Sequence, residues 1–382
     1  MIKNKLFFFF GVVLLTIIST AYCYTYNRFS FQKSEQYANT AIQKCRDNSN
    51  WKVCYSKELE KINKKISFTD TLAIMELIKK GDSKTSFCHI MAHNVVASEV
   101  EKNPEKWLSV LKYLNDPYSC NTGFIHGLVE AEKKYNPNVK FDENGIKNLC
   151  KAVFDVTKTS FYYPCAHAAG HVLLVESSAK IDPAAEICNK LPRHMQDPCL
   201  EGIFMEYINR PNLTFHGLTS GPLKKDEVTE EGMIQLCNAY SGNTAIGCWK
   251  ALALVINETK KADILKIKEV CNKSSFSEAA RECYFRAFDY ALNEDFFDQK
   301  QINGLCKDYE NGNQEFKCYE NAILALLYKK ERNVKLVQAL CNAAQNSFQS
   351  QCNNITEKYF GKITSGGNAA NIKLQINSFT QE

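Results

Sequence analysis

The stretch that decides the fold is AAEICNKLPRHMQDPCLEGIFMEY, residues 184–207. Its first part ends an apolar helical segment at Cys188, and after a polar connection a second helix is expected to begin near Cys199. Asp197 suits the N-cap of that second helix, and Pro198 suits its first position. A disulfide between the two cysteines would tie the end of one helix to the start of the next. A closed loop of this size contributes about 2–4 kcal/mol to stability.

The same arrangement recurs along the chain. Seven cysteine pairs lie at short spacing: Cys45/Cys54, Cys150/Cys165, Cys188/Cys199, Cys237/Cys248, Cys271/Cys283, Cys306/Cys318 and Cys341/Cys352. The second cysteines, together with Cys88 and Cys120, follow one another at steps of 34, 32, 45, 34, 49, 35, 35 and 34 residues. A step near 34 is the length of one two-helix repeat, so the sequence predicts an all-α solenoid or superhelix of about nine such repeats, with one disulfide per helical hairpin. Cys88 and Cys120 lack short-range mates, and we expect them to pair with each other across neighbouring repeats.

The repeats set the predicted domain boundaries. A disulfide-stapled repeat domain is expected over residues 27–361, with the histidine-bearing repeats at 82–206. The 49-residue step carries a Gly- and Pro-rich stretch, and an insertion is predicted at 207–231; insertions in solenoids usually emerge on one face, often the binding face. Residues 362–382 have lost the cysteine pattern and are expected to form a flexible C-terminal tail.

Residues 1–26 have the features of an export signal. Lys3 and Lys5 precede an apolar run over residues 6–18, and a small-residue site follows at 19–21, which is the pattern of a secretory signal peptide. An uncleaved membrane anchor is the alternative, because about twenty residues are enough to span a bilayer. Under either interpretation the rest of the chain is exported, to the periplasm or the extracellular space, and meets a membrane only through this N-terminal segment.

The composition agrees with export. The chain has 17 cysteines, and setting Cys23 aside leaves an even number, as expected of a disulfide framework in an oxidising compartment. Its hydrophobic content of 45% is sufficient for a buried core. The net charge of +5 comes from scattered lysines, without the basic patch that a nucleic-acid partner would require.

The histidines carry the main functional signal. Counted from the second cysteine of each repeat, His89 and His93 lie at offsets 1 and 5, His126 at offset 6, and His167 and His171 at offsets 2 and 6. Each HxxxH pair places two imidazoles on one face of a helix, one turn apart. Because equivalent helices of stacked repeats lie about 8–10 Å apart, we expect three successive helices to direct five imidazoles into one pocket.

Such a pocket predicts a metal centre. If the cysteines are consumed as disulfides, the ligands are imidazoles with some carboxylate, which suits zinc, copper or iron. Five histidines exceed what one structural zinc needs, so an open site or two metal ions are expected. Glu130 and Glu206 are the candidate catalytic carboxylates, as ligand or general base. The alternatives are that the histidines serve core packing, contact a haem or share this spacing by coincidence, and that the glutamates lie on helix surfaces.

Four glycines accompany the histidines: Gly123, Gly127, Gly170 and Gly202. A glycine inside a helix costs about 1 kcal/mol relative to alanine, and close approach of helices or room for a ligand would explain its presence. His216, in the insertion, is a candidate lid residue over the site.

Two architectural resemblances follow from these patterns. The ladder of one disulfide per hairpin resembles the cysteine-rich helical-repeat proteins of bacteria, although the cysteine spacing differs. Histidines supplied by successive repeats resemble the HEAT-repeat deoxyhypusine hydroxylases, whose His-Glu dipeptides this chain does not contain. Neither resemblance transfers a function.

Two functional hypotheses remain open at this point. One is an exported metalloenzyme of oxidative or hydrolytic type. The other is a non-catalytic scaffold that binds another protein on its concave surface. The chain contains no G-x-S-x-G, P-loop, HExxH or Rossmann motif that would favour another enzyme class.

Overall fold

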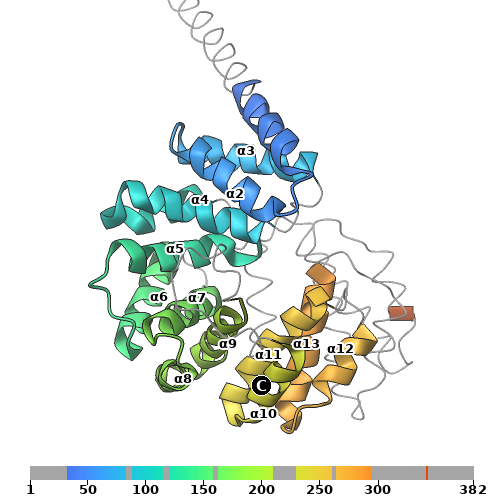
Figure 1. Cartoon of the computed structure of the whole chain (residues 1–382). Helices are drawn as coiled ribbons and strands as arrows, with labels where there is room; N and C mark the ends of the chain where they lie inside the picture. Colours follow the sequence, from blue (N-terminus) through green and yellow to red (C-terminus); the bar gives the residue numbers. More distant parts are fainter. Residues whose placement is uncertain are drawn as a thin grey trace, which may run out of the picture.

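The computed structural model describes residues 32–82, 88–114, 120–157, 162–209, 229–259, 264–293 and 341–342. All regular elements in this part of the chain are helical, which confirms the predicted class (Figure 1). Helical residues 32–45 come first. They are followed by α2 (Trp51–Asn63), α3 (Phe68–Gly81), α4 (His89–Lys102), η2 (Pro104–Tyr113), η3 (Cys120–Thr122), α5 (Gly123–Tyr135), α6 (Glu143–Thr157), α7 (Tyr162–Glu176), α8 (Ile181–Lys190), α9 (Arg193–Asn209), α10 (Glu230–Asn238), α11 (Gly242–Thr259), α12 (Ile264–Cys271) and α13 (Ser277–Asn293).

The helices form a stack of hairpins. Helices α2, α4, α5, α7, α9, α11 and α13 each pack on the next one in this series, and α6, α8, α10 and α12 each pack beside the helix that follows them. This is the two-helix repeat that the cysteine spacing predicts. The full solenoid of about nine repeats stays a prediction, since its last repeats lie outside the described residues.

Helix α7 is enclosed within this stack. It lies between α5 and α9, and every residue from Pro164 to Leu174 is buried. A helix enclosed on all sides is expected to be apolar around its whole circumference. His167 and His171 are the exceptions in this run, and buried polar side chains need a partner or a ligand.

Between described residues the structure has six disulfides, all with the predicted partners: Cys45–Cys54, Cys88–Cys120, Cys150–Cys165, Cys188–Cys199, Cys237–Cys248 and Cys271–Cys283. Five of them close a single hairpin, with sequence separations of 9 to 15 residues. The Cys88–Cys120 bridge spans 32 residues and joins the start of α4 to the start of α5, across two repeats. The predicted pairs Cys306/Cys318 and Cys341/Cys352 fall wholly or partly outside the described residues.

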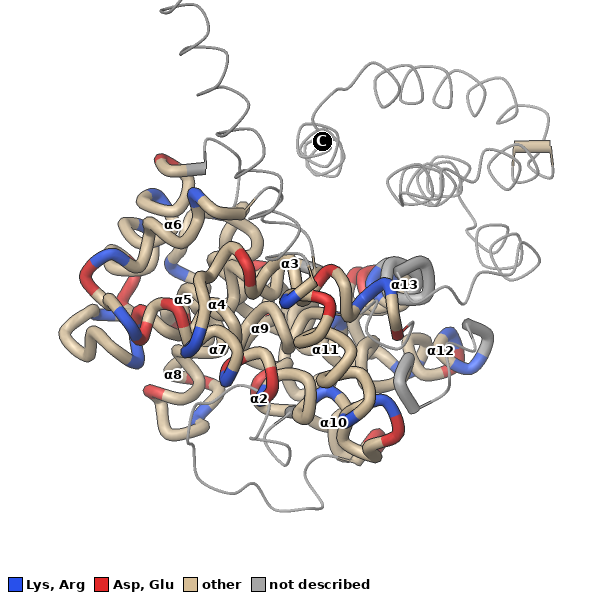
Figure 2. The backbone as a smooth tube through the Cα atoms, turned by 90° about the horizontal axis from the view of Figure 1, so that it is seen from above, with Lys and Arg blue, Asp and Glu red and all other residues tan. Residues whose placement is uncertain are grey.

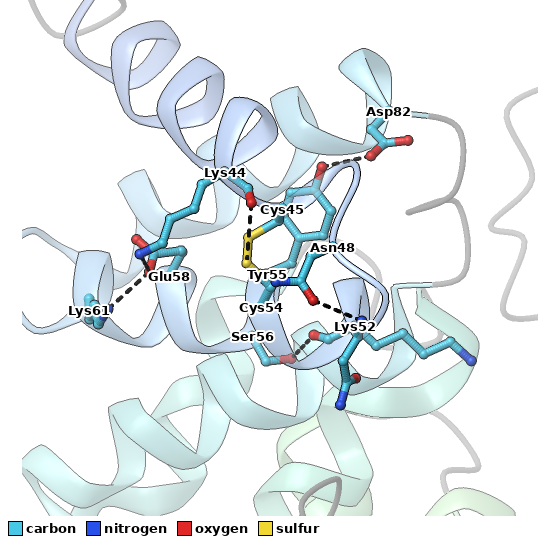
Figure 3. The surroundings of a disulfide bond; sticks show 11 residues. Lys44, Cys45, Asn48, Lys52, Cys54, Tyr55, Ser56, Glu58, Lys61 and Asp82 are labelled. Atoms are coloured by element: carbon cyan, nitrogen blue, oxygen red, sulfur yellow. Dashed lines mark hydrogen bonds and ion pairs between the residues drawn. A yellow bond between two sulfur atoms is a disulfide. The ribbon is translucent and has the colours of Figure 1, made fainter.

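Figure 3 shows how the first disulfide is embedded. Cys45 ends the first helical segment and Cys54 lies in the first turn of α2. Beside the bridge, the buried Tyr55 donates its hydroxyl to Asp82 at 2.7 Å. This bond ties α2 to the end of α3, so the disulfide holds the first hairpin and the buried polar contact joins that hairpin to the next helix.

One predicted helix start is wrong. Helix α9 begins at Arg193, so Asp197 is not its N-cap and Pro198 is its sixth residue. A proline there removes the N–H that would bond to the carbonyl of His194. Asp197 instead accepts a bond from Lys250 of α11 at 2.6 Å, and this contact between repeats replaces the local cap. His194, expected in the connection, lies exposed on the first turn of the helix.

Several predicted segments lie outside the described residues. They are the signal or anchor at 1–26, nearly all of the insertion at 207–231 with its candidate lid residue His216, and the tail at 362–382. Within the described ranges, no helix combines the length and the apolar character needed to cross a membrane. Basic and acidic residues are scattered over the described helices (Figure 2).

Candidate metal centre

The five histidines lie together, as the offsets predict. They come from α4, α5 and α7, which pack in that order. Their rings form a continuous chain with these centroid separations: His89–His93 6.3 Å, His89–His126 4.8 Å, His126–His167 4.9 Å, His126–His171 5.7 Å and His167–His171 5.0 Å. The spacing therefore predicted a real convergence of side chains from three repeats.

Three of these histidines form the tightest group. One ring nitrogen each of His126, His167 and His171 lie within 4.8 Å of one another. Nitrogen ligands of a tetrahedral zinc ion lie about 3.4 Å apart, given metal–nitrogen distances of about 2.0–2.1 Å. Modest side-chain rotations would close that difference. The three residues could therefore hold a transition-metal ion.

Burial keeps most of these imidazoles neutral. The five side chains are at most 9% exposed. Burial, reinforced by neighbouring histidines, lowers the pKa of His126 and of His167 well below the usual value. Burial and the proximity of His171 likewise lower the pKa of His93 to about 3. A neutral imidazole carries the lone pair that a metal needs, so the cluster is prepared for coordination at neutral pH.

Both glutamates singled out in the sequence lie against histidines. Glu130 Oε2 is 3.0 Å from His93 Nε2, between α5 and α4. Glu206 Oε2 is 3.0 Å from His171 Nδ1, between α9 and α7. Burial opposes a charge on His171, but the bond to Glu206 outweighs it and raises the pKa of His171. A carboxylate bonded to one ring nitrogen directs the other toward a metal, which is the relation that Glu206 has to His171.

His126 is oriented by the start of its own helix. The hydroxyl of Thr122 lies 3.3 Å from His126 Nε2, and Nδ1 is buried without a hydrogen-bond partner. Thr122 is a β-branched residue at φ 65°, in the left-handed region, a conformation that costs about 1–3 kcal/mol and is often found at functional sites. The unsatisfied Nδ1 is the atom of His126 that a ligand would complete.

The glycines explain how the histidine-bearing helices approach so closely. A Cβ at Gly123 or Gly127 would lie closer than 3.0 Å to the backbone of His89 or His93. Between α7 and α9, Gly170 and Gly202 pack in the same way on the backbones of Cys199 and His167. The expectation of close helix packing is thus confirmed.

One residue of the site was missed by the sequence analysis. Glu201 of α9 is fully buried. Its Oε1 accepts a bond from Arg286 Nε at 2.6 Å, its Oε2 accepts one from the Tyr163 hydroxyl, and the same oxygen lies 3.9 Å from His167 Nδ1 and from Lys250 Nζ. Burial opposes its charge, but Arg286 and Lys250 outweigh that effect and lower the pKa of Glu201.

A signal for Glu201 was present in the sequence. It lies at offset 2 from Cys199, the offset of His167 from Cys165, and Lys250 has the same offset from Cys248. Equivalent positions of successive repeats face the same interior. A charged residue at this position is therefore expected to lie next to the histidine of the preceding repeat.

The fold and the cluster define a class: an all-helical protein, stapled by disulfides between neighbouring helices, with a buried histidine group that could hold a metal. Models of known protein families, curated protein sequences and solved structures were compared with the chain, and none matches. The function is therefore inferred from the site itself.

Proposed function

We propose that this chain is an exported metalloprotein that binds a transition-metal ion through His126, His167 and His171. One observation carries the proposal: three buried ring nitrogens from two adjacent helices lie within 4.8 Å of one another. Buried polar atoms without partners are rare in native proteins, and both ring nitrogens of His167 and Nδ1 of His126 are such atoms here. A metal ion would satisfy one ring nitrogen of each histidine at the same time.

The donor set limits the identity of the metal. All the described cysteines of the neighbouring helices are in disulfides, so imidazole and carboxylate remain as ligands. They suit zinc, copper or iron. His89 and His93, with Glu130, extend the cluster on the α4 side, and we propose that they complete the coordination of the first ion or hold a second one.

Three protein nitrogens leave a coordination position for a water or a substrate, which is the arrangement of catalytic rather than structural metal sites. A bound ion would supply Lewis-acid or redox chemistry there. We propose an oxidative or hydrolytic enzyme, in which Glu130 or Glu206 accepts a proton. The burial of the cluster favours a small substrate, because a folded macromolecule cannot approach side chains that are at most 9% exposed.

The alternative of a non-catalytic scaffold accounts less well for the cluster. A scaffold needs no convergence of histidines, and buried imidazoles scattered through a core would each bond to a nearby carbonyl. The contact of five rings in one place is unnecessary for such a role. Export rests on the signal-like N-terminus and agrees with the six disulfides, which form in oxidising compartments.

Metal analysis of the purified protein, with its disulfides intact, tests the proposal. We expect about one or two equivalents of a transition metal per chain. The double variant His167→Gln/His171→Gln should lose most of it, because it removes two ligands from one rigid turn. His194→Gln is the matched control, since His194 is exposed and packs against Tyr162 at 5.2 Å. Protein that stays metal-free when offered zinc, copper and ferrous iron would refute the metal site.

A further inference from the structure

Helices α7 and α9 meet through two matched pairs of side chains. His171 of α7 faces Glu206 of α9, with 3.0 Å between Nδ1 and Oε2. One turn earlier, His167 faces Glu201, with 3.9 Å between the same two kinds of atom. Both histidines therefore present Nδ1 to a carboxylate.

Glu201 differs from Glu206 in how it is held. Arg286 of α13 holds Oε1 at 2.6 Å, and the Tyr163 hydroxyl donates to Oε2. Lys250 of α11 lies 3.9 Å from Oε2 and 5.8 Å from the centre of the Tyr163 ring. These groups fix the carboxylate in place, and the pairing with Arg286 and Lys250 favours its charged form although it is fully buried.

A buried network of charges is not expected to stabilise the fold by itself. Buried ion pairs usually give no net stability compared with well-packed apolar residues, because desolvation offsets their attraction. Each glutamate and cation here has a partner, so the network does not itself need a ligand. Its position is informative: it ends at His167 Nδ1, an atom that is buried and has no hydrogen-bond partner.

We infer that Glu201 is a positioning residue, which with Arg286 determines that His167 carries its proton on Nδ1 and offers Nε2 to a metal. An ionised carboxylate can only accept hydrogen bonds, so a proton on the facing nitrogen is favoured and a lone pair there is disfavoured. The same second-sphere relation is common for metal-binding histidines. The inference rests on the proposed function. The inference adds that Lys250 of α11 and Arg286 of α13 act on the candidate ligand His167 through Glu201. The described residues of α11 and α13 include no histidine.

The variant Glu201→Gln makes the inference testable. Arg286 can only donate, so it would select the amide oxygen of the new side chain and turn the amide NH2 group toward Tyr163 and His167. A donor facing Nδ1 favours the tautomer with the proton on Nε2. The variant should therefore reverse the tautomer of His167 and weaken metal binding by about 10–100-fold, the usual effect of removing such a partner.

Two measurements separate the inference from the proposed function. In metal-free protein labelled with 15N, two-bond proton–nitrogen correlation spectra report the tautomer of His167: we expect Nδ1–H in the wild type and Nε2–H in Glu201→Gln. Titration with Zn2+ and Co2+ then gives the affinity, and the Co2+ absorption bands report the coordination. Glu132→Gln, which changes another buried glutamate, and Arg281→Gln, on the same helix as Arg286, are controls that should change neither.

The outcomes are distinct. A wild-type His167 with its proton on Nε2 would overturn the inference even if Glu201→Gln fails to fold. An unchanged tautomer and an unchanged Zn2+ affinity in a folded Glu201→Gln variant would overturn it as well. If the wild type shows the expected tautomer but binds neither metal, the positioning role stands and the proposed function fails. Tyr163→Phe, which removes one bond to Glu201 and keeps the ring, should give a smaller loss of affinity than Glu201→Gln.

Discussion

Acidification of the metal-free protein should reduce its stability sharply below pH 7. His93, His126 and His167 have lowered pKa values because they are buried, so they stay neutral in the folded state at pH values where the unfolded chain binds protons. A group of this kind contributes stability that is complete above the unfolded pKa, about 6.5, and is lost as the pH falls below it.

The size of the effect follows from proton linkage. For a histidine that stays neutral when folded, acidification from pH 7 to 5.5 costs about 1.3 kcal/mol, and for three histidines about 4 kcal/mol. His171 has the opposite sign: its raised pKa contributes stability below pH 6.5 that is lost as the pH rises through its folded pKa. The net loss is somewhat below about 4 kcal/mol because His171 offsets part of it, and it is still a large part of the usual free energy of unfolding of a folded domain, about 5–15 kcal/mol.

Urea denaturation followed by circular dichroism, in EDTA and with the disulfides intact, measures this loss at pH 7 and at pH 5.5. His126→Asn should reduce the difference between the two pH values by about a third, since one of three protons is removed. His194→Asn should leave the difference unchanged because His194 is exposed. If the free energy of unfolding is the same at both pH values, the burial argument for neutral imidazoles is wrong.

Three further predictions concern packing, the disulfides and the metal. Gly127→Ala should lower the free energy of unfolding in urea by about 1–2 kcal/mol, because overpacking against the backbone of His93 outweighs the gain in helix propensity. The control Gly81→Ala should leave the free energy of unfolding unchanged, because a Cβ at residue 81 would meet only the flexible end of a side chain. Replacing both Cys188 and Cys199 with serine should cost about 3 kcal/mol in thermal or urea unfolding, and mass mapping of non-reduced wild-type peptides should recover that bridge; free thiols there would contradict the disulfide ladder. Bound metal should dissociate as the pH falls below about 6, because protons bind the histidines of the unfolded chain there and favour unfolding over the folded, metal-binding state. Metal retained at about pH 4 in equilibrium dialysis by protein that circular dichroism shows to be unfolded would argue against histidine ligands.

Much of the fold could be predicted because its signals are local and repeated. The spacing of cysteine pairs near 34 residues predicted the helical hairpins, and every described disulfide joins the predicted partners. The HxxxH spacing predicted one helix face for each histidine pair. Helix periodicity and repeat length are properties of the chain itself, so the convergence of His126, His167 and His171 followed from counting residues.

What the sequence could not determine depends on contacts between distant residues. Asp197 has the residue type of an N-cap, yet in the folded protein it bonds to Lys250, because contacts between repeats outweigh a local cap preference. Glu201 has no distinguishing neighbour in the sequence, but in the folded protein its carboxylate accepts bonds from Tyr163 of α7 and Arg286 of α13. The chain by itself determined the repeat, the disulfide partners and the candidate ligands. Only tertiary packing decided which carboxylate faces which histidine. The pKa of each group depends on its burial and on its distance from other charges, and both are set only when the helices are stacked.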